Sequence, residues 1–311
     1  MFSIILCHLF QTYHKVGWSD VFNMGVQVFL VMSGFLYGHK QIDDWKKWAQ
    51  KRISKIYLPY LVFLLMVLPL YILFHPEAII WKAVPFYFAN LQGFRFLWGG
   101  SFARIEGLRH VWFLTAIMCA YASTPILQKV KYNSGLALLF VFVLAGCSYL
   151  VFPTLRYTFV FSWVYLYAIG YLYVQLNPKL KRIFDGLCLV AIVVVLAVLK
   201  WDDLLHVYSV KYRVVHDLVG VFAVVWGVKL LSWVPNLKVP KIISLFDKYS
   251  FHVYLVHFII MHGPFSMAQL TNHAWINITL MLFVTVLSTY LFVIVLGFIN
   301  KQFGKLTKRK S

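Results

Sequence analysis

The sequence predicts an all-α, polytopic membrane protein with about ten transmembrane helices and both termini in the cytoplasm. The first observation behind this prediction is composition, since 61% of the 311 residues are hydrophobic, only 13% are charged, and the mean hydropathy is +0.76. Soluble domains of this size do not have such a composition. The other two observations are the lengths of the apolar runs and the distribution of Lys and Arg between them.

Most of the apolar runs reach the roughly 17–25 residues that cross a ~30 Å hydrocarbon core as a helix. They lie at residues 2–13, 21–38, 57–74, 110–127, 135–152, 157–176, 183–199, 214–233, 248–267 and 275–299. Only short loops separate most of them, and no internal repeat is visible. We therefore expect one transmembrane domain over residues 1–311 and no soluble domain.

The basic residues concentrate in every second loop. If residues 39–56 are cytoplasmic, 20 of the 29 Lys and Arg residues lie on that side and 9 outside. The 20 are Lys40, Lys46, Lys47, Lys51, Arg52, Lys55, Lys129, Lys131, Lys179, Lys181, Arg182, Lys229, Lys238, Lys241, Lys248, Lys301, Lys305, Lys308, Arg309 and Lys310. Cytoplasmic loops accumulate Lys and Arg in this way. The net charge of +19 is thus explained by membrane topology and contact with anionic headgroups, and no motif supports nucleic-acid binding.

Three segments depart from a simple alternation of spans and loops. The run at 2–13 is too short to cross; it is completed by residues absent from this sequence or enters only partway, and we prefer the first explanation. Residues 39–56 alternate Trp and Ile with basic residues, which predicts an amphipathic helix at the interface. In residues 75–109, an apolar patch at 79–91 suggests a re-entrant segment followed by an outer lid.

His8 is the first candidate for chemistry. A histidine in an apolar segment is energetically costly and faces a cavity or a polar partner. Its neutral ring accepts a proton near physiological pH, which suits a general base, although a structural hydrogen bond to a neighbouring helix explains it equally well.

Other segments have both structural and functional explanations. Gly25, Ser33, Gly34 and Gly38 allow close approach of helix backbones. Three cations within residues 51–55 either anchor topology or hold phosphates. His216 beside Asp217 is a capping pair or a base with its orienting carboxylate. His252 and His257 are five residues apart and do not share a helix face well, which argues against a paired metal site; no metal site is predicted elsewhere.

Five ordered signatures together resemble the acyltransferase 3 family, membrane enzymes that acylate cell-surface sugars. They are His8 closing the first span, GVQVFLVMSGF at 25–35, a basic run from Arg52 to Pro59, HVWFL at 110–114, and SFHVYLVH at 250–257. Two features depart from the family. Its arginine about eleven positions before the first-span histidine would precede Met1, and Lys55 stands where a second arginine is usual, which loses the planar guanidinium.

The resemblance implies transfer of an acyl group, most often acetyl, from acyl-CoA to a hydroxyl of a surface or capsular polysaccharide or its lipid-linked precursor. It makes His8 the catalytic base and places Arg52 and Lys55 at the cytoplasmic entry, holding the phosphates of CoA. Arg104, Glu106, Arg109 and His110 would bind the sugar or polarise the reacting carbonyl. The implied location is the bacterial inner or cytoplasmic membrane, with lipids as partners, no bound cofactor, and acetyl-CoA or another acyl-CoA as co-substrate.

Two alternatives stay open at this point. A transporter or flippase for a lipid-linked sugar would share a polar core but do no chemistry, and the lack of repeated halves counts against it. A non-catalytic remnant of the family is the second alternative, because of the short N-terminal run.

Overall fold

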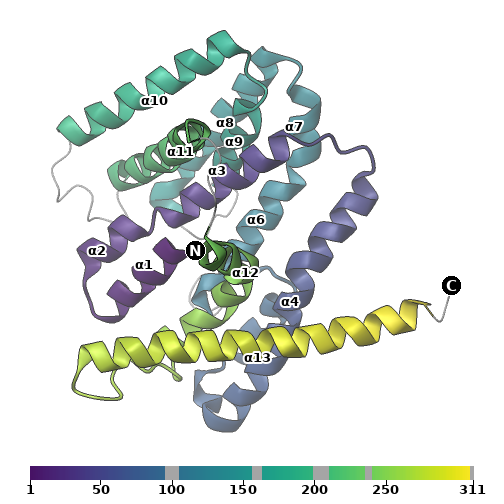
Figure 1. Ribbon diagram of the computed structural model, residues 1–311, viewed down its shortest axis with the longest axis vertical. Coiled ribbons are helices and arrows are strands. Elements are labelled where there is room, and N and C mark those ends of the chain that lie inside the picture. Colours follow the sequence, from purple (N-terminus) through teal and green to yellow (C-terminus); the bar gives the residue numbers. More distant parts are fainter. Residues whose placement is uncertain (95–104, 156–162, 199–209, 235–239, 309–311) are drawn as a thin grey trace.

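The computed structural model describes residues 1–94, 105–155, 163–198, 210–234 and 240–308, and within these ranges it contains helices and no strands (Figure 1). The α-helices are α1 Phe2–Thr12, α2 Val16–Phe22, α3 Gly25–Gly38, α4 Trp45–Phe74, α5 Val84–Phe88, α6 Trp112–Ala122, α7 Thr124–Val130, α8 Ser134–Leu155, α9 Val164–Tyr173, α10 Pro178–Val198, α11 Val210–Ser232, α12 Lys241–Met261 and α13 Ala274–Lys308. Single 3₁₀ turns occur at Pro76–Ala78 (η1), Trp81–Ala83 (η2) and Arg109–Val111 (η4). The predicted fold class, an all-α polytopic membrane protein, is confirmed.

Five helical stretches are long and apolar enough to cross a membrane: Gly17–Gly38, Trp45–Phe74, Arg109–Val130, Val210–Ser232 and Ala274–Gln302. Shorter apolar helices lie at Phe2–Thr12, Ser134–Leu150 and Val164–Tyr173. Apolar side chains on α8 and α13 point outward, with Phe142 78% and Val286 67% exposed, as expected where lipid replaces water. The count of about ten spans, and the cytoplasmic position of both termini, stay predictions.

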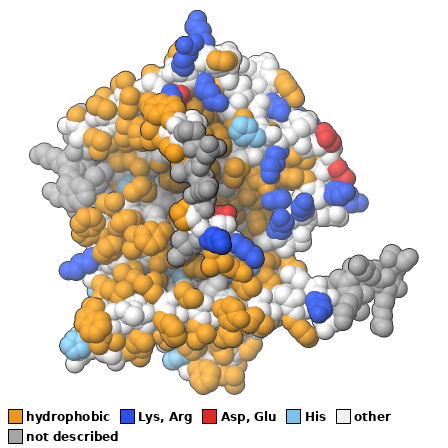
Figure 2. All heavy atoms as spheres, in the orientation of Figure 1, with side chains coloured by type: hydrophobic (Ala, Val, Ile, Leu, Met, Phe, Trp, Pro, Cys, Tyr) orange, Lys and Arg blue, Asp and Glu red, His pale blue; other side chains and the backbone are white. Residues whose placement is uncertain are grey.

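The surface repeats the contrast between apolar spans and basic connections. On the face shown in Figure 2, hydrophobic side chains cover most of the area, and Lys and Arg gather mainly along the upper edge and the right side. In Figure 1 these places correspond to the start of α10 and the connection from α3 to α4. Both belong to the loops that we expect in the cytoplasm.

The first packed core forms around α3 and α9, which cross at a pair of glycines. A Cβ at Gly34 would lie 2.0 Å from the carbonyl oxygen of Tyr167, and a Cβ at Gly170 would lie 2.0 Å from that of Val31. Both distances are far below van der Waals contact, so only glycine fits at either position. The expected close packing at Gly34 is therefore confirmed, with its partner on α9.

The second core joins α1, α4, α12 and α13. Its buried side chains include Ile5 and Leu9 of α1, Tyr60 of α4 and Leu255 of α12. This core holds α1 against α12 although α1 is only 11 residues long. The short first helix is thus positioned by its neighbours, and it places the half-buried His8 beside α12.

Residues 39–56 do not form a separate interfacial helix. The Asp44 carboxylate accepts a hydrogen bond from the backbone N–H of Lys47 (2.9 Å) and caps α4, which then runs 30 residues through Pro59 and Pro69. The basic, amphipathic segment is therefore the first part of a continuous spanning helix. An N-terminal cap at Asp44, which the sequence analysis did not identify, starts the helix early.

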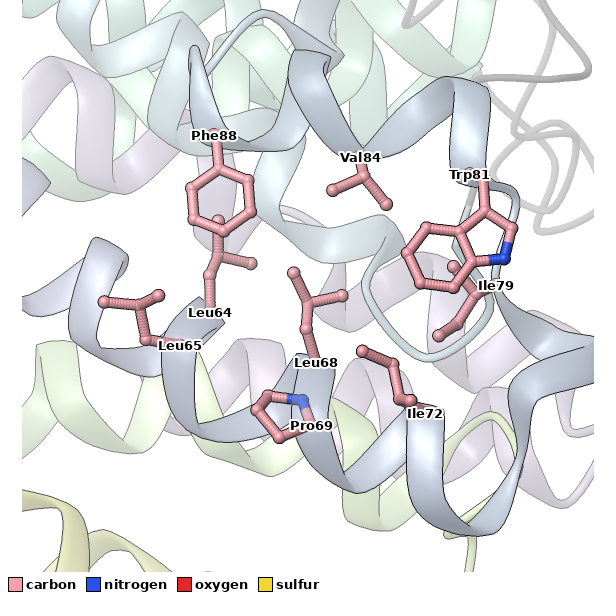
Figure 3. A pocket seen from close by; sticks show the side chains of 9 residues that line it. All are labelled: Leu64, Leu65, Leu68, Pro69, Ile72, Ile79, Trp81, Val84 and Phe88. Carbon is pink, nitrogen blue, oxygen red and sulfur yellow. The ribbon is translucent and has the colours of Figure 1, made fainter.

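The segment after α4 folds back along it in short turns. The hydroxyls of Tyr57 and Tyr60 donate to the carbonyl oxygens of Phe88 and Tyr87, which fastens α5 to α4. Between them lies an apolar groove, seen in Figure 3, lined by Leu64, Leu65, Leu68, Pro69, Ile72, Ile79, Trp81, Val84 and Phe88. No acidic, basic, hydroxyl or amide side chain is among these lining residues, so the groove lacks the groups that acyl transfer needs.

Candidate active site

Four histidines from three parts of the chain meet beside α12. They are His8 of α1, His110 of η4, His257 of α12 and His262 immediately after α12. The ring centre of His257 lies 5.4 Å from those of both His8 and His110, and the rings of His8 and His262 are 5.9 Å apart. We call these four residues the histidine cluster. Two of its members, His8 and His110, are residues that the sequence analysis proposed.

The His8 ring is oriented by a residue of its own helix. Its Nδ1 lies 2.7 Å from Oε1 of Gln11, one turn further along α1. An amide oxygen only accepts hydrogen bonds, so Nδ1 carries the ring proton and the lone pair is on Nε2. The turn is further held by Thr12, whose hydroxyl donates to the carbonyl oxygen of His8, and by His262, whose Nε2 lies 3.1 Å from that oxygen.

His110 and His257 are each anchored to backbone and buried. Nε2 of His110 donates to the carbonyl oxygen of Leu255 (3.2 Å), and Nδ1 of His257 donates to that of Tyr254 (2.8 Å). The residues are 5% and 0% exposed. The second ring nitrogen of each, Nδ1 of His110 and Nε2 of His257, is buried without a hydrogen-bond partner.

Aromatic side chains of α12 fix the spacing of the cluster. The Phe258 ring stacks on His110 at 4.8 Å and meets the edge of His8 at 4.7 Å. The hydroxyl of Tyr254 donates to the carbonyl oxygen of His110 (2.6 Å). These contacts hold His110 and His257 buried at α12, whereas His8 and His262 at the edge of the cluster are half-buried.

Two glycines bring the loop before His110 onto the end of α12. Gly107 and Gly263 have φ values of +76° and +88°, which favour glycine, and a Cβ at Gly263 would lie 2.7 Å from Cα of Gly107. The hydroxyl of Tyr71 donates to the carbonyl oxygen of Glu106 (2.6 Å). The side chains of Glu106 and Arg109 are exposed on this loop, next to the cluster but not within it. Arg104, the remaining residue proposed there, lies outside the described residues.

The two residues proposed for CoA phosphates differ in their surroundings. The guanidinium of Arg52 lies over the Tyr37 ring at 5.4 Å, and its Nε is buried without a partner. Nε1 of Trp48, one turn earlier on α4, is also buried without a partner. Lys55 is exposed. Among the described residues, no hydrogen bond, ion pair or ring contact joins Arg52 or Lys55 to the histidine cluster.

The remaining candidates have structural roles or different surroundings. Asp217 does not orient His216; it pairs with Arg213 (2.7 Å) and accepts hydrogen bonds from Tyr149 and Tyr165. The ring of His252 contacts those of Tyr249, Phe251 and Phe292. The described part of the chain contains no group of three or more His, Cys, Asp or Glu side chains placed to hold a metal ion.

Neither Gln11 nor a role for His257 was predicted from the sequence. Gln11 was detectable, because residues three apart share a helix face and a glutamine there reaches the histidine ring. The proximity of His257 to His8 was not detectable from spacing, since the two residues are 249 positions apart in the sequence.

A family model described as an acyltransferase domain, the acyltransferase 3 model, matches residues 1–297 of the 311. No curated protein and no solved structure was found to match the chain. The family match covers nearly the whole chain and includes every helix that contributes to the histidine cluster. The chain therefore belongs to the acyltransferase 3 family and is a membrane acyltransferase.

Proposed function

We propose that the protein is an O-acyltransferase that moves an acyl group, most often acetyl, from acyl-CoA to a sugar hydroxyl. The acceptor is a surface or capsular polysaccharide or its lipid-linked precursor, and the enzyme works in the bacterial inner or cytoplasmic membrane. The observation that carries this proposal is the orientation of His8 by Gln11, which leaves the lone pair on Nε2, beside two further histidines.

His8 is the general base in this proposal. Its Nε2 takes the proton of the acceptor hydroxyl as the oxygen attacks the thioester carbonyl, and the protonated ring then gives this proton to the departing sulfur of CoA. One bond forms, from the sugar oxygen to the acyl carbon, and the carbon–sulfur bond breaks. The hydrogen bond from Nδ1 to Gln11 keeps the ring in the tautomer that this step requires.

The donor is held at the start of α4. The buried, unpartnered Nε of Arg52 supports an anion contact there, because a guanidinium binds phosphate with several donors at once. Lys55 is exposed three residues later and adds a mobile positive charge. The phosphates of CoA match this pair in charge and in location, since acyl-CoA is made in the cytoplasm.

The acceptor side is formed by the loop that ends at His110. Glu106 and Arg109 are exposed on it, and its backbone is held on α12 through Gly107. Exposed charged side chains beside a buried polar cluster suit a sugar that enters from outside, and Arg104 belongs to the same proposed set.

The experiment is acyl transfer by the purified, reconstituted protein. Radiolabelled acetyl-CoA and an extract of surface glycan from a strain lacking the gene serve as donor and acceptor. We expect transfer by the wild type and a rate about 10²–10⁴-fold lower for His8→Ala, the typical effect of losing a general base. His252→Ala is the matched control, because His252 lies on α12 outside the cluster.

Two results would contradict the proposal. Normal transfer by His8→Ala would remove the base assignment. A wild type that transfers nothing, combined with an unchanged glycan in the strain lacking the gene, would favour the non-catalytic alternative.

A further inference from the structure

Two buried nitrogen atoms in the histidine cluster lack a hydrogen-bond partner. His110 and His257 each use one ring nitrogen to donate to a backbone carbonyl oxygen, which can only accept. The ring proton is therefore on that nitrogen, and the other nitrogen presents a lone pair. A buried acceptor left without a donor is unfavourable, so each of these atoms is a specific place for a ligand to bind.

The rings that carry these two nitrogens lie close to the ring of the proposed base. The His257 ring is 5.4 Å from both His8 and His110, so three imidazoles share one small volume and each has a lone pair on its remaining nitrogen. Acceptors cannot bond to one another. The missing partner must bring hydrogen-bond donors, and more than one of them.

A hydroxyl-rich molecule fits this requirement better than a cation. No group of His, Cys, Asp or Glu side chains in the described part of the chain is placed to hold a metal ion. Hydroxyl groups on adjacent ring carbons are donors with a fixed, short spacing, and they suit several acceptors held close together.

We propose that His110 and His257 form a second hydroxyl site. It receives a hydroxyl of the acceptor next to the one that His8 deprotonates. This inference rests on the proposed function. It specifies that the acceptor has neighbouring hydroxyl groups, and it gives His257 a role in binding one of them. The hydrogen bonds from Tyr254 to His110 and from His257 to Tyr254 fix the two rings relative to each other, which is what recognition of a fixed hydroxyl pair requires.

The test compares two kinds of acceptor on three forms of the enzyme. Methyl hexopyranosides and their monodeoxy counterparts are offered to the reconstituted wild type, to His257→Leu and to the control His252→Leu. For the wild type we expect kcat/KM to fall about 10- to 100-fold when the hydroxyl next to the acylated one is missing. The ratio of kcat/KM for the complete sugar to kcat/KM for the deoxy sugar measures this discrimination. We expect the ratio to fall to near one in His257→Leu and to stay unchanged in His252→Leu.

A merely structural role for His257 would lower the rates with both acceptors equally and leave the ratio unchanged. That result, or a wild type indifferent to every deoxy position, overturns the proposal. His257→Gln, which restores an acceptor atom, is expected to recover part of the ratio and provides a second variant if the leucine variant does not fold.

A binding measurement separates this inference from the proposed function. Saturation-transfer NMR without acyl-CoA compares binding of the same sugars to the wild type and to His257→Leu. If no sugar is acylated but binding still distinguishes the deoxy sugars through His257, the second hydroxyl site is supported and the proposed acyl transfer is rejected. If acylation occurs but binding does not discriminate between the complete and the deoxy sugars, the acyl transfer is supported and the second hydroxyl site is rejected. If there is neither acylation nor discrimination, both proposals are rejected.

Discussion

At the scale of single residues, the proposed base and the proposed CoA-binding residue have different surroundings. His8 lies in a cluster where each histidine ring has a hydrogen bond. The guanidinium of Arg52 lies over the Tyr37 ring, and its Nε is without a hydrogen-bond partner. The surroundings of His8 suit proton transfer, which requires a fixed geometry. Those of Arg52 suit phosphate binding, which requires mainly a positive charge.

Gln11 is expected to control the rate of transfer without contacting either substrate. Gln11→Leu removes the acceptor for Nδ1 of His8, so the ring is free to rotate and change tautomer, and we expect kcat to fall about 10- to 100-fold with little change in KM. Gln11→Glu keeps an acceptor and should retain most of the activity. Because a carboxylate beside His8 favours the protonated ring, the acidic limb of the pH–rate profile should move to higher pH. Equal loss of activity in both variants would argue that Gln11 only packs; Gln41→Leu, at an exposed site, is the control.

Arg52 is expected to act on the donor. Arg52→Ala should raise the KM for acyl-CoA roughly 10- to 150-fold, the equivalent of a lost charge-assisted contact, and leave the KM for the acceptor unchanged. Steady-state kinetics of the reconstituted enzyme measure both constants. Lys46→Ala, at an exposed position on the same helix, provides the control. A silent Arg52→Ala would mean that this residue only helps to set topology, as other bases in the segment do.

At the scale of helices, the site depends on crossings that leave no room for side chains. The loop that carries His110 meets the end of α12 backbone to backbone at Gly107 and Gly263. The crossing of α3 and α9 supports the first core in the same way. Close approach of this kind is how membrane helices associate where no hydrophobic effect between them is available.

Gly34→Ala is expected to destabilise the protein. Its new methyl group would lie 2.0 Å from a carbonyl oxygen of α9, so the two helices must move apart, at about 1–3 kcal/mol or more. The melting temperature in detergent, followed by fluorescence-detected gel filtration, should fall by several degrees. Gly227→Ala, whose Cβ would meet nothing within 4 Å, is the control and should leave the melting temperature unchanged or raise it. A stable Gly34→Ala would mean that the crossing tolerates expansion.

At the scale of the whole molecule, the basic residues define an orientation that can be tested directly. In a cysteine-free background, Ser134→Cys and Ser244→Cys should react with an impermeant thiol reagent only from the cytoplasm. Both positions are exposed, and both follow the distribution of Lys and Arg. Asn272→Cys, exposed between α12 and α13, should react only from outside, as should Ser101→Cys, which lies outside the described residues. Reaction of Ser244→Cys from outside would break the ten-span topology.

Fold class could be predicted from sequence because hydropathy and charge are local quantities. The length and hydropathy of each apolar run indicate by themselves whether that run lies in the membrane. The bounds of α4 could not, since a single cap at Asp44 makes an apparent loop part of a span. For the site, the resemblance identified His8 and His110 but not their shared contact with His257. That contact depends on how α1, η4 and α12 pack, and no spacing along the chain encodes it.

The crossing of α3 and α9 is symmetric in a way that couples its two glycines. The carbonyl that would touch a Cβ at Gly34 belongs to the residue three before Gly170, and the carbonyl that would touch a Cβ at Gly170 belongs to the residue three before Gly34. A local two-fold axis thus passes between the helices. Once one substitution has pushed them apart, the second finds the space already open. Gly34→Ala and Gly170→Ala should therefore show strong epistasis, and the double variant should lose less stability than the sum of the two single variants. In evolution the two positions would behave as a single site.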